Sequence, residues 1–185
     1  MRKLMLLLLA IVTMTSCSQE EKVNVRWATF NMRYDNPSDA PNHWGARKER
    51  VAQYIKEMKF DVFGTQEVLH NQFEDLKTLL PEFEGIGVGR DDGATQGEYS
   101  AVFYNKNVFD ALDSGTFWIS PTPEKVGVKG WDAALPRICS YVRLQDKVTK
   151  VKFWFFNLHM DHVGVEARRE GAKLIIKQVL EMCGK

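Results

Sequence analysis

The residues best suited to chemistry follow a strongly apolar run near the end of the chain. The run 151–156 is almost entirely apolar and predicts a buried strand. His159, Asp161 and His162 follow it directly, and Gly164 then leads into a helical pattern. Imidazole and carboxylate groups on a loop at the end of a strand are well placed to contact a ligand. On this segment alone, ordinary loop histidines bonded to the backbone are an equally good interpretation.

Four further polar residues lie at the ends of predicted strands. They are Asn31, Glu67, Glu98 and Arg137. Singly they carry little weight, because a glutamate in such a place is usually solvated and an asparagine usually forms a turn. Only as a set, together with His159, do they point to a site.

The first third of the chain alternates between strands and helices. Apolar and β-branched residues predict strands over 23–30 and 61–65. Apolar residues at helical spacing predict helices over 46–59 and 68–80, the second stopped by Pro81. Each predicted strand therefore ends at a polar residue and passes into a loop or a helix.

The rest of the chain is rich in predicted strands. They cover residues 83–88, 98–104, 108–119, 137–144 and 151–158, the third broken at Gly115. The last two are expected to pair across the turn 145–150, and a helix with one apolar face follows over 165–182. No repeat or linker divides residues 23–185, which predicts one domain-sized unit.

The N-terminus has the pattern of an export signal. Residues 1–16 carry two basic residues and an apolar run too short to span a bilayer, and so predict a signal peptide. The small residues before Cys17 suggest a bacterial lipoprotein, with 17–22 as a lipid-anchored tether. We therefore expect an exported protein, held to a membrane by lipid on Cys17, in the periplasm or at the cell surface. The alternative is an ordinary cleaved signal with an incidental cysteine.

Charge and cysteine content limit the possible partners. Removal of residues 1–16 takes away two basic residues and changes the formal net charge from +1 to −1. No basic stripe marks a nucleic-acid-binding protein. Export would permit a disulfide between Cys139 and Cys183, but nothing in the sequence requires one.

Taken together, the candidate residues resemble the endonuclease/exonuclease/phosphatase family, which includes DNase I-like nucleases, neutral sphingomyelinases, inositol-phosphate phosphatases and deadenylases. The resemblance is carried by residues 29–33, 66–67, 97–100 and 157–162, with Gly164, Ala167 and Arg168. Residues 130–137 look like a loop of the secreted bacterial branch. The resemblance implies an α+β fold, a DNase I-like sandwich of two β-sheets with outer helices. It also implies a phosphoric ester hydrolase that depends on Mg²⁺ (or Mn²⁺).

The resemblance further implies a role for each residue of the set. Asn31 and Glu67 would hold the metal, Glu67 as the direct ligand, since Mg²⁺ prefers hard oxygen donors. His159 would contact the scissile phosphate, and Glu98 would orient His159 and raise its pKa. Arg137 would face the phosphate with its planar fork. For Glu98 and Arg137 an ordinary ion pair at a strand end is the alternative.

The two other polar residues of the loop after the apolar run receive lesser roles. Asp161 and His162 are expected to stabilise the loop that holds His159. Zinc binding by His159 and His162 is a weaker alternative, because no thiolate or third histidine lies nearby in the sequence.

Two later motifs of the family are missing from this sequence. They resemble Gly-Asp-Phe-Asn and Ser-Asp-His, and in the family they supply the water-activating carboxylate, further metal ligands and a second histidine. We therefore expect the chain to be the N-terminal part of a longer protein, with its fold incomplete at the C-terminus. Sheet surface should be left uncovered, and the chain alone should be inactive.

The expected activity of the longer protein is hydrolysis of a phosphoester by in-line attack of water, in a monomer. A phosphodiester is the first choice, and the substrate could be a nucleic acid, a phospholipid head group or a sugar phosphate. The alternative is a non-catalytic surface lipoprotein that binds glycan or lipid on the same scaffold. The joint presence of Asn31, Glu67 and His159 favours the enzyme.

Overall fold

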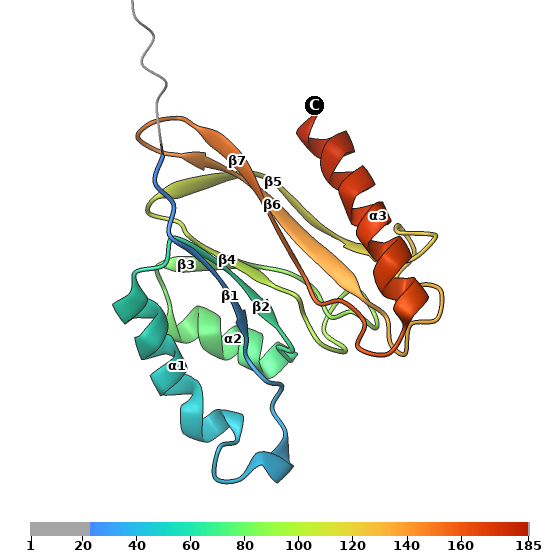
Figure 1. Cartoon of the computed structure of the whole chain (residues 1–185). Helices are drawn as coiled ribbons and strands as arrows, with labels where there is room; N and C mark the ends of the chain where they lie inside the picture. Colours follow the sequence, from blue (N-terminus) through green and yellow to red (C-terminus); the bar gives the residue numbers. More distant parts are fainter. Residues whose placement is uncertain (1–22, 185) are drawn as a thin grey trace, which may run out of the picture.

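Two β-sheets packed face to face form the centre of the molecule (Figure 1). The computed structural model describes residues 23–184. The first sheet has the strand order β1-β2-β4-β3. Its strands are β1 (Trp27–Asn31), β2 (Val62–Gln66), β3 (Phe83–Ile86) and β4 (Val102–Asn105). Because β1 and β2 are parallel, both end at the same edge of the sheet, so Asn31 and Gln66 lie in register.

The second sheet is an antiparallel meander of β5 (Phe109–Trp118), β6 (Ile138–Asp146) and β7 (Lys152–Leu158). The predicted pairing of the last two strands is confirmed. The predicted break at Gly115 is wrong, because β5 continues through it and its irregularity lies between Ala111 and Asp113. Gly115 instead makes room for a side chain, since a Cβ atom there would lie 2.6 Å from the hydroxyl oxygen of Tyr141.

Helices cover the outer faces of both sheets (Figure 1). The helices α1 (Trp44–Met58) and α2 (His70–Leu79) pack on the first sheet, preceded by the short 3₁₀ helix η1 (Pro37–Asp39). The helix α3 (Val165–Cys183) packs on the second sheet. The result is helix, sheet, sheet and helix in successive layers, which confirms the predicted α+β sandwich.

Three apolar clusters fill the spaces between these layers. The first joins α1 and α2 to the first sheet around Trp44, Leu76 and Phe103. The second lies between the sheets and includes Val102 and Leu144. The third lies under α3. Burial of large apolar side chains between each pair of layers is the main favourable contribution to folding.

Two predicted boundaries fail for one reason. The strand β4 begins later than the predicted strand 98–104, and α2 begins later than the predicted helix 68–80. Val68 and Tyr99 form an isolated antiparallel bridge, in which the Tyr99 amide donates to the Val68 carbonyl at 2.7 Å. This long-range pairing holds both segments in extended, non-helical form beside the site. The other elements shift only at their ends: 23–30, 46–59, 83–88, 137–144, 151–158 and 165–182 become β1, α1, β3, β6, β7 and α3.

The run 151–156, predicted to be buried, is only half-buried in β7. Phe153 and Phe155 line a hollow of about 320 Å³ with Val62 and Trp27, and the Trp27 side chain is 64% exposed. Apolar sheet surface is thus uncovered at this edge, as expected from the sequence.

The predicted signal peptide (1–16), Cys17 and the tether (17–22) lie outside the described residues. Among the helices of residues 23–184, none is long and apolar enough to cross a bilayer. Cys139 and Cys183 are both free, and burial raises the pKa of the Cys139 thiol to about 12.

Candidate active site

A cavity of about 350 Å³ opens where β1, β2 and β7 end. It is lined by Arg33, Tyr34, Glu67, Arg90, Glu98, Leu135, Arg137, His159 and His162. Four residues of the predicted set therefore meet in one place, and the fifth, Asn31, contacts Glu67. A larger hollow of about 550 Å³ lies at the opposite end of β1, but it is open and holds neither histidine nor a pair of carboxylates. The residues that line this hollow therefore do not make it a candidate active site.

Two buried amides join the sheets directly behind the cavity. Gln66 Nε2 donates to Asn157 Oδ1 at 2.7 Å, and Asn157 Nδ2 donates to the carbonyl oxygens of Thr65 and Ala101 at 2.7 and 3.0 Å. Gly64 is needed opposite them, because a Cβ atom there would lie 2.3 Å from Asn157 Oδ1. We call this pair, Gln66 and Asn157, the amide clamp. It fixes the register of β2 against β7, and so the position of Glu67 relative to His159.

Glu67 and Asn31 form the predicted metal-binding corner. Asn31 Nδ2 donates to Glu67 Oε1 at 2.9 Å, while the Arg33 amide donates to Asn31 Oδ1 at 2.9 Å. Glu67 and Arg33 adopt left-handed backbone conformations, with φ of 59° and 57°. Such conformations cost about 1–3 kcal/mol each in non-glycine residues and cluster at functional sites. The backbone here turns the Glu67 carboxylate out of the strand into the cavity.

The donor chemistry of this corner fits a hard divalent cation. Mg²⁺ is commonly held by one or two carboxylates together with water and the phosphate oxygens of a substrate. Glu67 supplies one carboxylate; Asn31 contacts it through Nδ2, so the Asn31 amide oxygen reaches the same cation only with the amide turned over. Within residues 23–184 no three His, Cys, Asp or Glu side chains cluster as a metal site. That finding also leaves the zinc alternative at His159 and His162 without support, since His162 Nδ1 already contacts Arg137.

Arg137 is the centre of the opposite corner and is only 5% exposed. Its Nε donates to Asp161 Oδ2 at 3.1 Å, and its Nη2 donates to His162 Nδ1 at 2.9 Å. Its Nη1 makes a long contact of 3.5 Å with His159 Nδ1. Asp161 and His162 therefore hold Arg137, and Asp161 also accepts from the Val163 and Gly164 amides of the loop after His159, the loop-stabilising role expected for it. Arg137 also forms the ion pair that was the alternative to a phosphate-binding role, with Asp161, but it does so in the wall of the cavity.

Asp161 is an ionised anchor beneath this corner. Its burial disfavours the charged form, but four hydrogen bonds outweigh that effect and hold the pKa of the carboxyl well below its usual range. The donors are the amides of Gly164, Val163 and Ala134 and the guanidinium of Arg137. The negative charge compensates Arg137 and ties the loop after β7 to the segment before β6.

His159 departs from the predicted electrostatics. Burial first, and then the charge of Arg137, lower its pKa, although Glu67 and Glu98 act in the opposite sense. Glu98 does not bond to His159 anywhere in the described chain; its Oε2 accepts from Arg90 Nη1 at 2.7 Å. The prediction that Glu98 orients His159 by direct contact is therefore wrong, and the charge of Glu98, which does raise the pKa of His159, is outweighed by burial and Arg137. Since Arg137 can only donate, His159 Nδ1 is an acceptor and the ring proton sits on Nε2.

The cavity also contains residues to which the sequence pattern gave no role. Arg90 lies between the predicted strands 83–88 and 98–104, and Arg33 and Leu135 lie inside the quoted motifs 29–33 and 130–137 without a role of their own. Tyr34 gave no signal, because a lone tyrosine in a loop has no distinguishing spacing. Arg90 could have been noticed only through its partner Glu98, and nothing in the sequence reveals that contact.

The fold and this cavity define a known class of protein. Residues 28–175 match the model of the Endonuclease/Exonuclease/phosphatase family, and the chain belongs to that family. A comparison with functionally curated proteins gives no match.

Solved structures from Bacteroides are similar to the chain. A family member from Bacteroides vulgatus is 55% identical with a TM-score of 0.87, over 88% of this chain and 62% of that one. A second, from Bacteroides thetaiotaomicron, is 47% identical with a TM-score of 0.83, over 85% and 58%. The mannosyl-6-phosphatase of Bacteroides thetaiotaomicron is 46% identical with a TM-score of 0.83, over 86% and 60%. The chain thus spans about three fifths of the length of these proteins.

Proposed function

We propose that the whole protein hydrolyses a phosphoester in a metal-dependent reaction at this cavity. One observation carries the proposal: the amide clamp brings a carboxylate–amide corner from one sheet against an arginine–histidine corner from the other. A glycan- or lipid-binding module would not need these two corners together. The strained backbone at Glu67 favours the enzyme in the same way.

Each corner has its own task in this proposal. Glu67 and Asn31 would hold Mg²⁺ or Mn²⁺, which when bound neutralises charge on the phosphate. His159, uncharged near neutral pH, presents its Nε2–H to a phosphate oxygen. Arg137, fixed by Asp161, adds a positive field that costs no reorganisation during the reaction.

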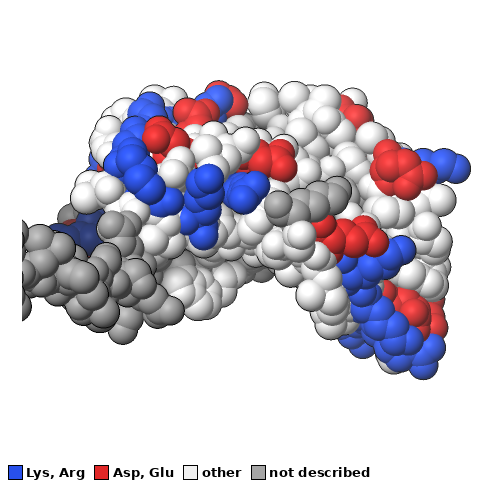
Figure 2. Space-filling view, turned by 90° about the horizontal axis from the view of Figure 1, so that it is seen from above, with Lys and Arg blue, Asp and Glu red and all other residues white. Residues whose placement is uncertain are grey.

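A phosphorylated sugar is the substrate class that we favour. The mannosyl-6-phosphatase from Bacteroides thetaiotaomicron, 46% identical to this chain, supports that choice over the phosphodiester first expected. Figure 2 shows the face away from the ends of β1, β2 and β7, where basic and acidic side chains are interspersed among uncharged ones. The phosphodiester and the phospholipid head group stay predictions for the assay to separate.

The test measures turnover of a phosphomonoester and a phosphodiester against metal concentration, in the full-length protein. Glu67→Gln removes the charge that holds the cation, so activity should fall and be partly restored by more metal. His159→Ala removes a donor at the developing charge, so the rate should fall about 10²–10³-fold without rescue by metal. Glu181→Gln and His43→Ala, both at exposed positions, serve as matched controls. Absence of metal-dependent turnover of either ester by the wild type would overturn the proposal.

A further inference from the structure

Arg90 is a buried cation in the cavity wall that the proposed mechanism does not use. We propose that Arg90 is a second phosphate-binding arginine, and that it makes the site selective for phosphomonoesters over phosphodiesters. This inference rests on the proposed function and names its substrate class.

The guanidinium of Arg90 has hydrogen-bond donors that lack an acceptor. Its Nη1 bonds to Glu98, but the buried Nε has no hydrogen-bond partner in the described chain. Its Nη2 likewise donates to no residue between 23 and 184. The residue is 8% exposed and lines the cavity. A buried donor without an acceptor costs about 1–3 kcal/mol, more when charged, and calls for an explanation. The Nε is shielded from the cavity and lies 3.8 Å from Asp91 Oδ1, whereas Nη2 is left to donate to an anionic ligand in the cavity.

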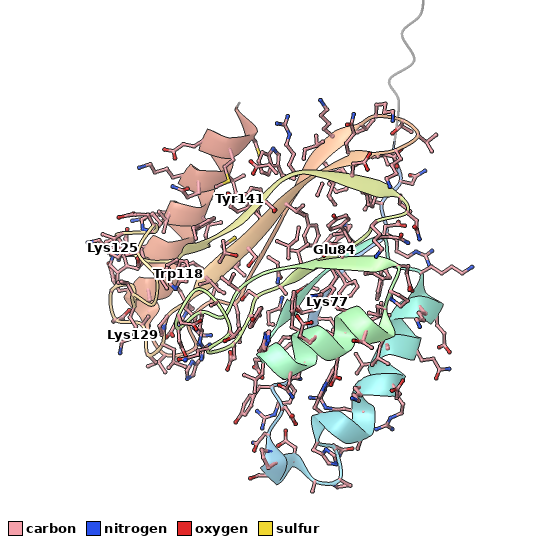
Figure 3. The ribbon with its side chains drawn as sticks, turned by 180° about the vertical axis from the view of Figure 1, so that it is seen from behind. Lys77, Glu84, Trp118, Lys125, Lys129 and Tyr141 are labelled. Carbon is pink, nitrogen blue, oxygen red and sulfur yellow. The ribbon has the colours of Figure 1, made fainter. Side chains whose placement is uncertain are left out.

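The backbone around Arg90 holds the side chain in place. The Arg90 amide donates to the Glu98 carbonyl at 3.2 Å, and the buried Trp118 Nε1 donates to the Arg90 carbonyl at 2.7 Å. Figure 3 shows Trp118 at the end of β5, beside the loop that carries Lys125 and Lys129. Gly97, with φ of 80°, allows close approach, since a Cβ atom there would lie 3.0 Å from Arg90 Cγ. The spare donors are therefore preorganised, which reduces the entropy lost on binding.

Position and charge make the phosphate the natural acceptor. Arg90 and His159 line the same cavity, so both side chains face a phosphate bound there. The cavity wall carries three arginines, Arg33, Arg90 and Arg137, and two glutamates, and Asp39 and Asp161 pair with Arg33 and Arg137 from outside it. A divalent cation at Glu67 would shift this balance toward positive charge. Such a wall suits a dianion better than a monoanion.

The third oxygen of the phosphate distinguishes the two ester classes. A phosphomonoester carries close to two negative charges near pH 7 and offers three terminal oxygens. A phosphodiester carries one charge and offers two terminal oxygens, because the third is esterified. The metal corner and the Arg137–His159 corner engage two oxygens, and Arg90 is left to engage the third. A diester would leave Arg90 buried without an acceptor, and sites of this kind reject ligands that lack the expected group.

Another interpretation is that Arg90 only neutralises Glu98. That role uses Nη1, and the contact of 3.8 Å between Nε and Asp91 Oδ1 accounts for the second nitrogen, but Nη2 is left unexplained. The experiment separates the two interpretations by comparing a ligand whose third oxygen is free and charged with one whose third oxygen is methylated.

Binding is measured calorimetrically in the presence of Mg²⁺, with methyl phosphate and dimethyl phosphate as probes. We expect Arg90→Gln to weaken binding of methyl phosphate about tenfold or more, as for a lost hydrogen bond to a charged group. Binding of dimethyl phosphate should change less than about twofold, which also shows that the cavity is folded. Arg90→Lys should recover only part of the loss, because it lacks the planar fork. Arg50→Gln, at an exposed position of α1, is the control. Equal weakening of both probes, or of neither, would overturn the inference.

A second readout keeps this inference separate from the proposed function. In the full-length protein, the ratio of kcat/KM for a monoester to that for a diester should fall about tenfold or more in Arg90→Gln. An unchanged ratio, with normal wild-type turnover, contradicts the role of Arg90 alone. Loss of all wild-type turnover would contradict the proposed function, whatever the binding data show.

Discussion

His159 and Arg137 act as one electrostatic unit. Burial and the neighbouring guanidinium both disfavour the imidazolium, so the pKa of His159 lies below its usual value. Replacement by Arg137→Gln removes the second cause but not the first. We therefore expect this change to raise the pKa of His159, with burial still holding it below 6.5. An NMR titration of the ring protons measures it, with the exposed Arg169→Gln as control. A pKa above 6.5 in the wild type would contradict this account.

Asp161 should make the protein sensitive to acid. Its folded-state pKa is below its unfolded-state value, so the stabilisation is fully present above the unfolded value, about 3.9, and is lost as pH falls toward the folded value. Asp161→Ala leaves Arg137 buried without its carboxylate, which should lower the free energy of unfolding by about 3–5 kcal/mol at neutral pH. Urea unfolding between pH 7 and pH 3 measures both effects. A variant whose stability falls as steeply with acid as the wild type would show that the acid sensitivity arises elsewhere.

At the scale of single residues, the sequence predicts which residues line the site better than it predicts which of them contact one another. Asn31 and Glu67 end parallel neighbouring strands, so their meeting follows from the topology. The partner of Glu98 does not follow, because it depends on the path of the loop that carries Arg90. Sequence spacing has no information on that path. The lowered pKa of His159 could not be predicted either, because it comes from burial and the nearby charge of Arg137, which arise only in the folded chain.

Among the elements, β2 and β7 depend on the amide clamp for their mutual position. Asn157→Leu keeps the approximate volume but leaves the Thr65 carbonyl and one Gln66 donor without partners, whereas the Ala101 carbonyl still accepts from the Thr65 amide. Each buried group so orphaned should cost about 1–3 kcal/mol of unfolding free energy. Asn107→Leu, at an exposed position, should change stability by no more than about 0.5 kcal/mol. Chemical denaturation measures both variants, and similar losses in the two would contradict a special role for the clamp.

The type and order of the elements could be predicted because apolar periodicity and turn residues are local signals. The failures all involve distant partners. Val68 leaves α2 because it pairs with Tyr99, and Gly115 stays within β5 because it accommodates Tyr141. In both cases a tertiary contact overrides the local pattern, as is common for strands.

At the scale of the whole molecule, attachment to a membrane depends on Cys17, which lies outside the described residues. The small residues before Cys17 and the polar segment after it predict a diacylated N-terminus. Cys17→Ala should abolish incorporation of a fatty-acid probe by cells that express the protein, and should release it from the membrane fraction. Cys183→Ala, at an exposed free cysteine, is the matched control. Equal labelling of the Cys17 variant and the wild type would remove the anchor.

Because of the amide clamp, the geometry of the site depends on the relative position of the two sheets. Gln66 directly precedes Glu67, and Asn157 lies two positions before His159, so the groups that join the layers and the groups that would do the chemistry move together. A slip between the sheets that left every strand and helix intact would still separate the two corners. On heating, therefore, hydrolytic activity should be lost when the contact between the sheets loosens rather than when the helices and strands unfold. The loss of activity and the loss of secondary structure need not occur at the same temperature.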